Sequence, residues 1–265
     1  MPYDYAVHSD LLVYWTGKDI DLEYDRKWPE KDKSDTRGKP ELEQAYHERL
    51  FSILKYGLWA TKPQEEPDDS QIGHVCFTEL RLSLCRRHAR QYGRLGIGVK
   101  RSFLFERGGR PVTYYAQEAR FSPHDQFLQS CRAHMATEGL RHLRHFLKPM
   151  NSSDSLNYDW YAESEWRIVV AQKATEFVSY EEADKVAKQY VNSTDPHRSK
   201  FRYWVPLDGW LSCIIYPSVT LKARAWEDAG IRNEINRIKT ARNHANRVER
   251  GNMPVEMDLD LCRNF

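Results

Sequence analysis

The sequence of 265 residues contains no long hydrophobic run. Its apolar stretches fall well short of the roughly 20 residues that a membrane-spanning helix needs, so we expect no membrane span. Residues 1–5 have neither the basic nor the apolar region of a signal peptide. The 5 cysteines are odd in number and scattered, which argues against a disulfide framework. These absences predict a cytoplasmic protein with reduced thiols.

Several familiar catalytic signatures are also missing. No Ser or Cys occupies a recognisable nucleophile elbow. The glycines within residues 95–99 interrupt an apolar run and do not open a helix, so they are not a dinucleotide-binding fingerprint. Cys85 and His88, and likewise Cys131 and His134, have the spacing of zinc ligands, but neither pair is flanked by turn glycines. We therefore predict no metal site.

Charge is spread unevenly along a chain whose formal net charge is only +2. Residues 81–110 carry nine Lys or Arg residues against one acid, and residues 222–250 carry eight against four acids. Such stretches either neutralise phosphates or form solvated helix faces. The chain also has 8 Trp, 15 Tyr and 10 Phe, which stack on bases in some proteins and fill the core in others. A nucleic-acid acceptor, RNA or DNA, is thus one of the partners we consider.

The spacing of apolar residues predicts an α+β protein. Short apolar runs typical of strands occupy residues 11–16, 75–78, 95–99, 111–115, 161–172, 201–207 and 211–216. Helical patterns occupy residues 41–56, 80–91, 102–107, 124–147, 180–190 and 222–250. The charged residues 18–40 are expected to form an exposed excursion. We predict one domain over residues 1–220, followed by a basic C-terminal helix and tail over residues 221–265.

Two carboxylates stand at the head of an apolar run, in the sequence Glu-Ser-Glu-Trp-Arg over residues 163–167. Residues two apart on a strand face the same way, so Glu163, Glu165 and Arg167 are expected to share one face, with Trp166 on the other. This arrangement is either catalytic or a surface ion pair worth about 0–1 kcal/mol.

A longer pattern surrounds these acids and resembles a known family. Its specific part runs from Cys76 to Val112, with outlying pieces at 14–17, at Tyr114 and at 163–167. Together these pieces resemble the AbiGi family of bacterial abortive-infection proteins, which are encoded in phage-defence loci, over residues 10–220. Because members of that family are often labelled antitoxins, the resemblance implies a cognate toxin or antitoxin protein as a partner.

The order of the motifs is also similar to that of the ADP-ribosyltransferases. Those enzymes place a residue that grips NAD on a first strand, a hydroxyl or aromatic residue on a second, and a catalytic Glu on a late strand. Here Tyr14-Trp15-Thr16, Thr78 and Glu165 follow in that order, although Tyr14 stands where His or Arg is common. This resemblance implies a mixed sheet core like that of the transferases, with flanking helices, and NAD as a substrate.

The resemblance also implies roles for particular residues. Transfer of ADP-ribose passes through a transition state that resembles an oxocarbenium ion. Glu165 would stabilise its positive charge, and Glu163 would take the proton from the incoming nucleophile. The residues expected to contact NAD are Tyr14, Trp15, Thr16, Thr78, Tyr92, Arg94 and Arg167. For Tyr14 to Thr16 the competing interpretation is an ordinary buried strand, and for Arg94 it is a surface arginine after a helix C-cap.

Two functions are therefore expected from the sequence. The first is a toxin-like ADP-ribosyltransferase of a phage-defence system, which transfers ADP-ribose from NAD to a nucleic acid or protein. The alternative is a non-catalytic antitoxin or sensor that binds a partner protein or a nucleotide in the same cleft.

Overall fold

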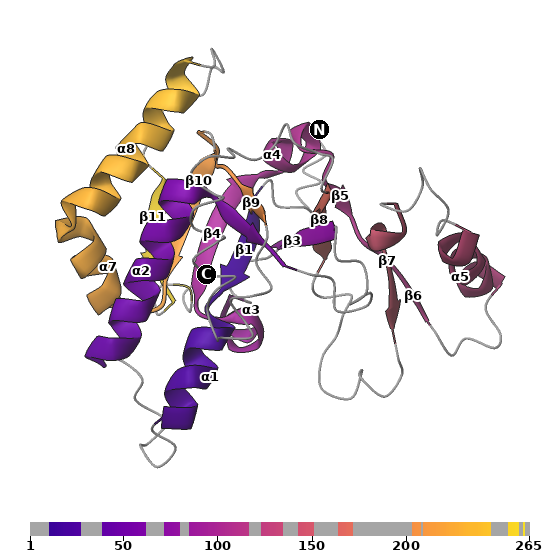
Figure 1. Cartoon of the computed structure of the whole chain (residues 1–265), viewed down its shortest axis with the longest axis horizontal. Coiled ribbons are helices and arrows are strands. Elements are labelled where there is room, and N and C mark those ends of the chain that lie inside the picture. The colour runs from indigo at the N-terminus through magenta and orange to yellow at the C-terminus, as the bar shows by residue number, and fades with distance from the viewer. Residues whose placement is uncertain are drawn as a thin grey trace, which may run out of the picture.

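A seven-stranded mixed sheet forms the centre of the molecule (Figure 1). Its strands are β1 (Leu11–Thr16), β3 (Ile72–Glu79), β4 (Leu95–Lys100), β5 (Arg110–Pro111), β8 (Glu165–Ala171), β10 (Leu211–Tyr216) and β11 (Val255–Asp258). They lie in the order β11-β10-β4-β1-β3-β8-β5, and neighbours are antiparallel except β10 and β11, which are parallel. The computed structural model describes residues 11–27, 39–61, 72–79, 85–116, 123–134, 143–150, 164–171, 203–207, 209–244, 254–259 and 262.

Helices cover both faces of this sheet. The described helices are α1 (Lys18–Lys27), α2 (Pro40–Tyr56), α3 (Cys85–Tyr92), α4 (Arg101–Glu106), α5 (Pro123–His134), α7 (Val219–Glu227) and α8 (Ala229–His244), with a 3-10 turn, η2 (Leu143–Phe146). Helix α5 lies away from the sheet, beside β6 (Figure 1). The predicted α+β class with a large mixed sheet is confirmed. In the part of the chain that the structure describes, no helix is both long and apolar enough to cross a membrane.

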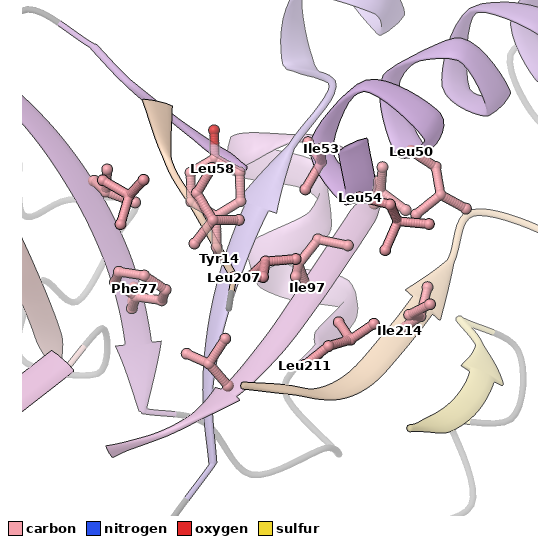
Figure 2. Close-up of a cluster of buried hydrophobic side chains, with 14 of the residues drawn as sticks. Tyr14, Leu50, Ile53, Leu54, Leu58, Phe77, Ile97, Leu207, Leu211 and Ile214 are labelled. Atoms are coloured by element: carbon pink, nitrogen blue, oxygen red, sulfur yellow. The ribbon is translucent and has the colours of Figure 1, made fainter. Parts of the chain in front are cut away.

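The alternation of side chains along β1 divides the core into two clusters. Leu12 and Tyr14 point into the larger cluster, which also contains apolar residues of α1, α2, α7 and α8. Figure 2 shows part of it, including Leu50 of α2 and Ile214 of β10. Val13 and Trp15 point the other way, into a smaller cluster with α3. Residues of the predicted NAD-binding strand therefore lie on opposite faces of the sheet.

Two small ribbons extend the sheet. The strands β2 (Leu58–Ala60) and β9 (Tyr203–Val205) pair with each other, and a bridge between Thr61 and His74 ties them to β3. The strands β6 (Thr113–Ala116) and β7 (Leu147–Met150) form a parallel ribbon. The polar residues that contact β8 come from this β6–β7 ribbon and from η2; they are Tyr114, Lys148 and His145.

Several predicted boundaries need correction. Residues 18–27 form α1, although the sequence predicted an exposed excursion there. The sequence predicted one helix over 124–147, but helix α5 ends at His134. The turn η2 begins at residue 143, and the strand β7 follows it and pairs with β6. The helix predicted at 180–190 lies outside the described residues.

The sequence predicted one helix over 222–250, but the part of this segment that the structure describes, up to His244, forms two helices, α7 and α8. The two helices are separated at Asp228. Its Oδ1 accepts a hydrogen bond of 3.0 Å from the backbone N–H of Ile231 and so caps α8. Ile231 and Ile235 of α8 are fully buried against the larger core, and Arg237 donates to the backbone oxygen of Leu54 at the end of α2. Residues after 220 thus share the core of the residues before them.

We expect the Asp228→Ala variant to lose about 1 kcal/mol of unfolding free energy, because it removes the cap of α8. The same side chain also reaches α2, where Nε2 of His47 lies 3.1 Å from its other carboxylate oxygen. Urea denaturation measures the loss. Asp228→Asn keeps an acceptor at the cap and should stay within about 0.5 kcal/mol of wild type. Equal losses for the two variants would contradict the capping role.

Candidate functional site

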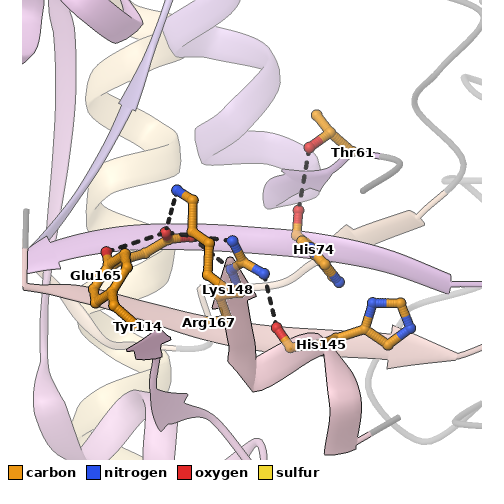
Figure 3. A network of polar contacts seen from close by, with 7 residues as sticks. All are labelled: Thr61, His74, Tyr114, His145, Lys148, Glu165 and Arg167. Atoms are coloured by element: carbon orange, nitrogen blue, oxygen red, sulfur yellow. Dashed lines mark hydrogen bonds and ion pairs between the residues drawn. The ribbon is translucent and has the colours of Figure 1, made fainter. Parts of the chain in front are cut away.

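A cluster of buried and half-buried polar side chains lies on the face of β3 and β8 that points away from the larger core (Figure 3). We call it the Glu165 cluster. Its members are His74 of β3, Tyr114 of β6, His145 of η2, Lys148 of β7, and Glu165 and Arg167 of β8. Trp166 points the opposite way, into the larger core, so the predicted alternation along β8 is confirmed. Glu163 lies outside the described residues.

The carboxylate of Glu165 is fully engaged by neighbouring side chains. Arg167 donates from Nε to Oε1 at 2.6 Å, and Lys148 donates from Nζ to Oε2 at 3.0 Å. The hydroxyl of Tyr114 donates a longer hydrogen bond to Oε2, at 3.4 Å. Only 5% of Glu165 and 3% of Arg167 are exposed, so the alternative of a surface ion pair is wrong. The pair is buried.

Electrostatics keep Glu165 ionised. Burial alone would raise the pKa of its carboxyl group, but the charges of Arg167 and Lys148 outweigh burial and lower the pKa to about 2. An acid with this pKa does not carry a proton at neutral pH, so Glu165 is unsuited to act as a general acid there. It can still stabilise positive charge.

Two other members of this face are held neutral. Burial, followed by the charge of Arg167, lowers the pKa of His74 to about 2. The His74 ring meets the His145 ring edge to face, with 4.8 Å between the ring centroids. Burial raises the pKa of the Cys76 thiol well above its usual value. Neither His74 nor Cys76 therefore changes charge near neutral pH.

Some of the predicted NAD contacts do lie beside Glu165. Thr78 is opposite Glu165 in the β3–β8 register, and Trp15 donates from Nε1 to the Thr78 hydroxyl at 3.2 Å. Arg167 contacts Glu165 directly and also donates from Nη1 to the backbone oxygen of His145 at 2.7 Å. The structure thus brings together Trp15, Thr78, Glu165 and Arg167.

Tyr14 and Thr16 lie on the other face of β1. The Tyr14 hydroxyl donates to the backbone oxygen of Trp59 at 3.4 Å, and burial raises its pKa to about 12. The Thr16 hydroxyl accepts a hydrogen bond of 2.9 Å from Arg49, whose guanidinium also pairs with Asp19. Neighbouring residues on a strand face opposite ways, so Tyr14, Trp15 and Thr16 cannot all face one bound ligand.

The two remaining predicted contacts have other neighbours. Arg94 pairs with Asp21 of α1 at 2.8 Å, and its backbone N–H donates to the Tyr46 hydroxyl at 3.1 Å. Tyr92 packs against the smaller core cluster. In the structure the charge of Arg94 therefore holds α1 next to β4.

Sequence reasoning missed Tyr114, His145 and Lys148. Lys148 interrupts an otherwise apolar stretch over 147–150, which is a weak sign of a buried cation with a partner. The sequence around Lys148 does not identify Glu165 as that partner. Lys148 and Tyr114 lie opposite each other only after β6 and β7 have paired. Across the described ranges, no group of three His, Cys, Asp or Glu side chains is placed to hold a metal ion.

Comparison with known proteins gives one match. The family described as abortive phage resistance protein AbiGi, antitoxin, matches residues 69–204, about half of the chain. The matched region contains all six members of the Glu165 cluster, whereas β1, α7 and α8 lie outside it. No curated protein and no solved structure matches the chain.

Proposed function

The chain belongs to the AbiGi family of abortive phage resistance proteins, and we propose that it acts as the antitoxin of a phage-defence pair by binding a toxin protein. The family description supports a role in phage defence and a toxin as the partner. We assign toxin binding to the region over residues 69–204, because that region carries the family match.

The observation that carries this proposal is the closure of the Glu165 cluster. Glu165 is the best candidate for a catalytic carboxylate, yet it is buried and both of its oxygens are engaged by Arg167 and Lys148. A ribose hydroxyl would have to displace these cations to reach the carboxylate. Separating the members of a buried ion pair is strongly unfavourable.

The cluster has a clear structural role. Lys148 and Tyr114 extend from the β6–β7 ribbon to Glu165, and the backbone oxygen of His145 accepts from Arg167. A two-stranded ribbon is only marginally stable by itself in water. These contacts therefore fasten the ribbon to the central sheet, and we expect them to keep the toxin-binding region in a single conformation.

ADP-ribosyl transfer is the second candidate function. The observation in its favour is that Glu165 is ionised and fixed beside Thr78 and Trp15, as stabilisation of an oxocarbenium ion requires. NAD would then be the substrate, and a nucleic acid or protein the acceptor. Three of the residues expected to contact NAD bind other parts of the protein instead, which weakens this candidate. They are Tyr14, Thr16 and Arg94.

Co-expression with the toxin encoded in the same defence locus separates the two functions. As an antitoxin, the chain should restore growth of cells that express the toxin, and it should be harmless when expressed alone. The matched variant is Glu165→Met with Arg167→Met, which removes the ion pair without leaving a buried charge from either residue. We expect this variant to restore growth as wild type does, because the apolar packing of the two Met side chains replaces the polar contacts that fasten the ribbon.

NAD consumption by the purified protein is the second readout. We expect none, with or without cell lysate. Growth arrest by the chain alone, together with NAD loss that the double variant abolishes, would contradict the antitoxin function and favour NAD chemistry at Glu165. Failure to restore growth, for a variant whose melting temperature matches wild type, would also count against the proposal.

A further inference from the structure

Helix α7 carries an apolar stripe on its solvent side. Val219 is 62% exposed and Trp226 is 56% exposed, and the exposed Ala223 lies between them. Their spacing of i, i+4 and i+7 places the three side chains on one helix face. Leu221 and Ala225 occupy the opposite face and are fully buried in the larger core. The stripe is therefore not part of the protein's own interior.

Charged residues of opposite sign border this stripe. At 100° per residue, Lys222 lies on one side of it and Glu227 on the other. Trp226 itself is held in position, because the guanidinium of Arg232 lies 4.8 Å from its ring centroid and is anchored by Glu256 at 2.8 Å. A positioned, half-exposed tryptophan beside an arginine is the kind of residue pair that dominates protein interfaces.

We propose that two copies of this chain associate through their α7 helices, packed in parallel. The stripe has the pattern of a helix-pairing seam, with Val219 and Trp226 as d positions and Ala223 as the a position between them. Lys222 and Glu227 then take the g and e positions, five residues apart. Across a parallel pair, Lys222 meets the partner's Glu227, and this ion pair occurs twice by symmetry.

The charge pattern selects the parallel arrangement. In an antiparallel pair related by a two-fold axis, each side of the stripe lies against the same side of the partner's stripe. Lys222 would then face the partner's Lys222, and the two charges would repel. The small side chain of Ala223 in the middle of the seam lets the two helices approach closely. The proposed occupant is thus a second copy, whose charges are known to be complementary.

The location of α7 is compatible with this association. In Figure 1, α7 and α8 lie at one end of the molecule, and the β6–β7 ribbon and α5 lie at the other. Helix α7 also lies outside residues 69–204, which match the AbiGi family. A dimer formed through α7 therefore leaves the region assigned to toxin binding uncovered, and the two proposals fail or succeed independently.

Light scattering after size-exclusion chromatography tests the proposal on the full chain. Wild type should have twice the 31.3 kDa mass of one chain at micromolar concentration and should dissociate on dilution. Lys222→Glu or Glu227→Lys alone should raise the dimer dissociation constant about tenfold or more, because each places like charges together twice. The double exchange of both residues should restore wild-type association.

Two further variants complete the test. Trp226→Ser should leave a folded monomer, whereas Phe127→Ser, at a 64% exposed site on α5, should leave the dimer intact. A monomeric wild type at all concentrations would overturn the proposal. A dimer that resists Trp226→Ser, or that the double charge exchange fails to restore, would show that another surface or another helix orientation is used.

Discussion

Replacing Glu165 with Gln is expected to lower the free energy of unfolding by about 3–5 kcal/mol. The variant is close to Glu in size, so the loss comes from charge and not from volume. It removes the negative charge that contacts Arg167, which is 3% exposed, and Lys148. Removing one member of a buried ion pair costs this much because the remaining charge is kept from water.

Urea denaturation followed by circular dichroism measures the loss. Glu48→Gln, on the exposed side of α2, is the matched control and should stay within about 0.5 kcal/mol of wild type. The double variant Glu165→Met with Arg167→Met should recover most of the stability, because two apolar side chains replace the pair. A single variant as stable as wild type would mean that the carboxylate is hydrated and not closed off.

The same contact makes stability depend on pH. The pKa of Glu165 falls from its ordinary value of 4.5 to about 2 in the folded state. A group whose pKa is lowered by folding stabilises the protein above the unfolded pKa, and this contribution disappears as pH falls through the folded pKa. Wild type should therefore lose stability between about pH 5 and pH 2, and the double variant should lose less over that range.

Replacing Gly93 with Ala is expected to cost more than about 4 kcal/mol, an exceptional value for one methyl group. Gly93 joins α3 to β4 with a φ of +110°, which L residues rarely adopt. An added Cβ would lie 2.3 Å from the backbone nitrogen of Lys18 and 2.4 Å from the backbone carbonyl of Thr16. Backbone atoms cannot rotate away, so β1 and α1 would have to move.

Gly108 provides the matched control for this glycine. It also has a positive φ, +68°, but an added Cβ would meet no atom within 4 Å. Gly108→Ala should therefore show only the backbone cost of about 1–2 kcal/mol. The difference between the two variants in thermal denaturation reports the steric contact with β1 and α1 together with the more strained φ of Gly93. Equal losses for Gly93→Ala and Gly108→Ala would contradict that contact.

Much of the local structure was predictable from the sequence. Apolar alternation identified β8 and placed Glu165 and Arg167 on one face, because a strand has a period of two. Helical spacing identified α2, which ends at Tyr56 and is followed by Gly57, whose N–H is bonded to the Ile53 oxygen. The break at Asp228 was harder to predict, because apolar residues keep helical spacing on both sides of it.

The candidate site was only half predictable. The sequence placed the acid and the arginine together, since they are two residues apart on one strand. It could not supply Lys148, Tyr114 or His145, because these come from segments that meet β8 only after the chain has folded. Two of the predicted NAD contacts, Arg94 and Thr16, lie away from Glu165 for the same reason, because they bind Asp21 of α1 and Arg49 of α2 instead.

The sequence by itself therefore determined the resemblance to the family, the α+β class and the shared face of Glu165 and Arg167 on one strand. These depend on short-range patterns, such as strand alternation and the motifs around Cys76 to Val112. Only the tertiary structure decided whether that pair is exposed or buried, since burial depends on the β6–β7 ribbon that covers it. The enclosed, fully paired carboxylate is what shifts the proposed function from a transferase to an antitoxin.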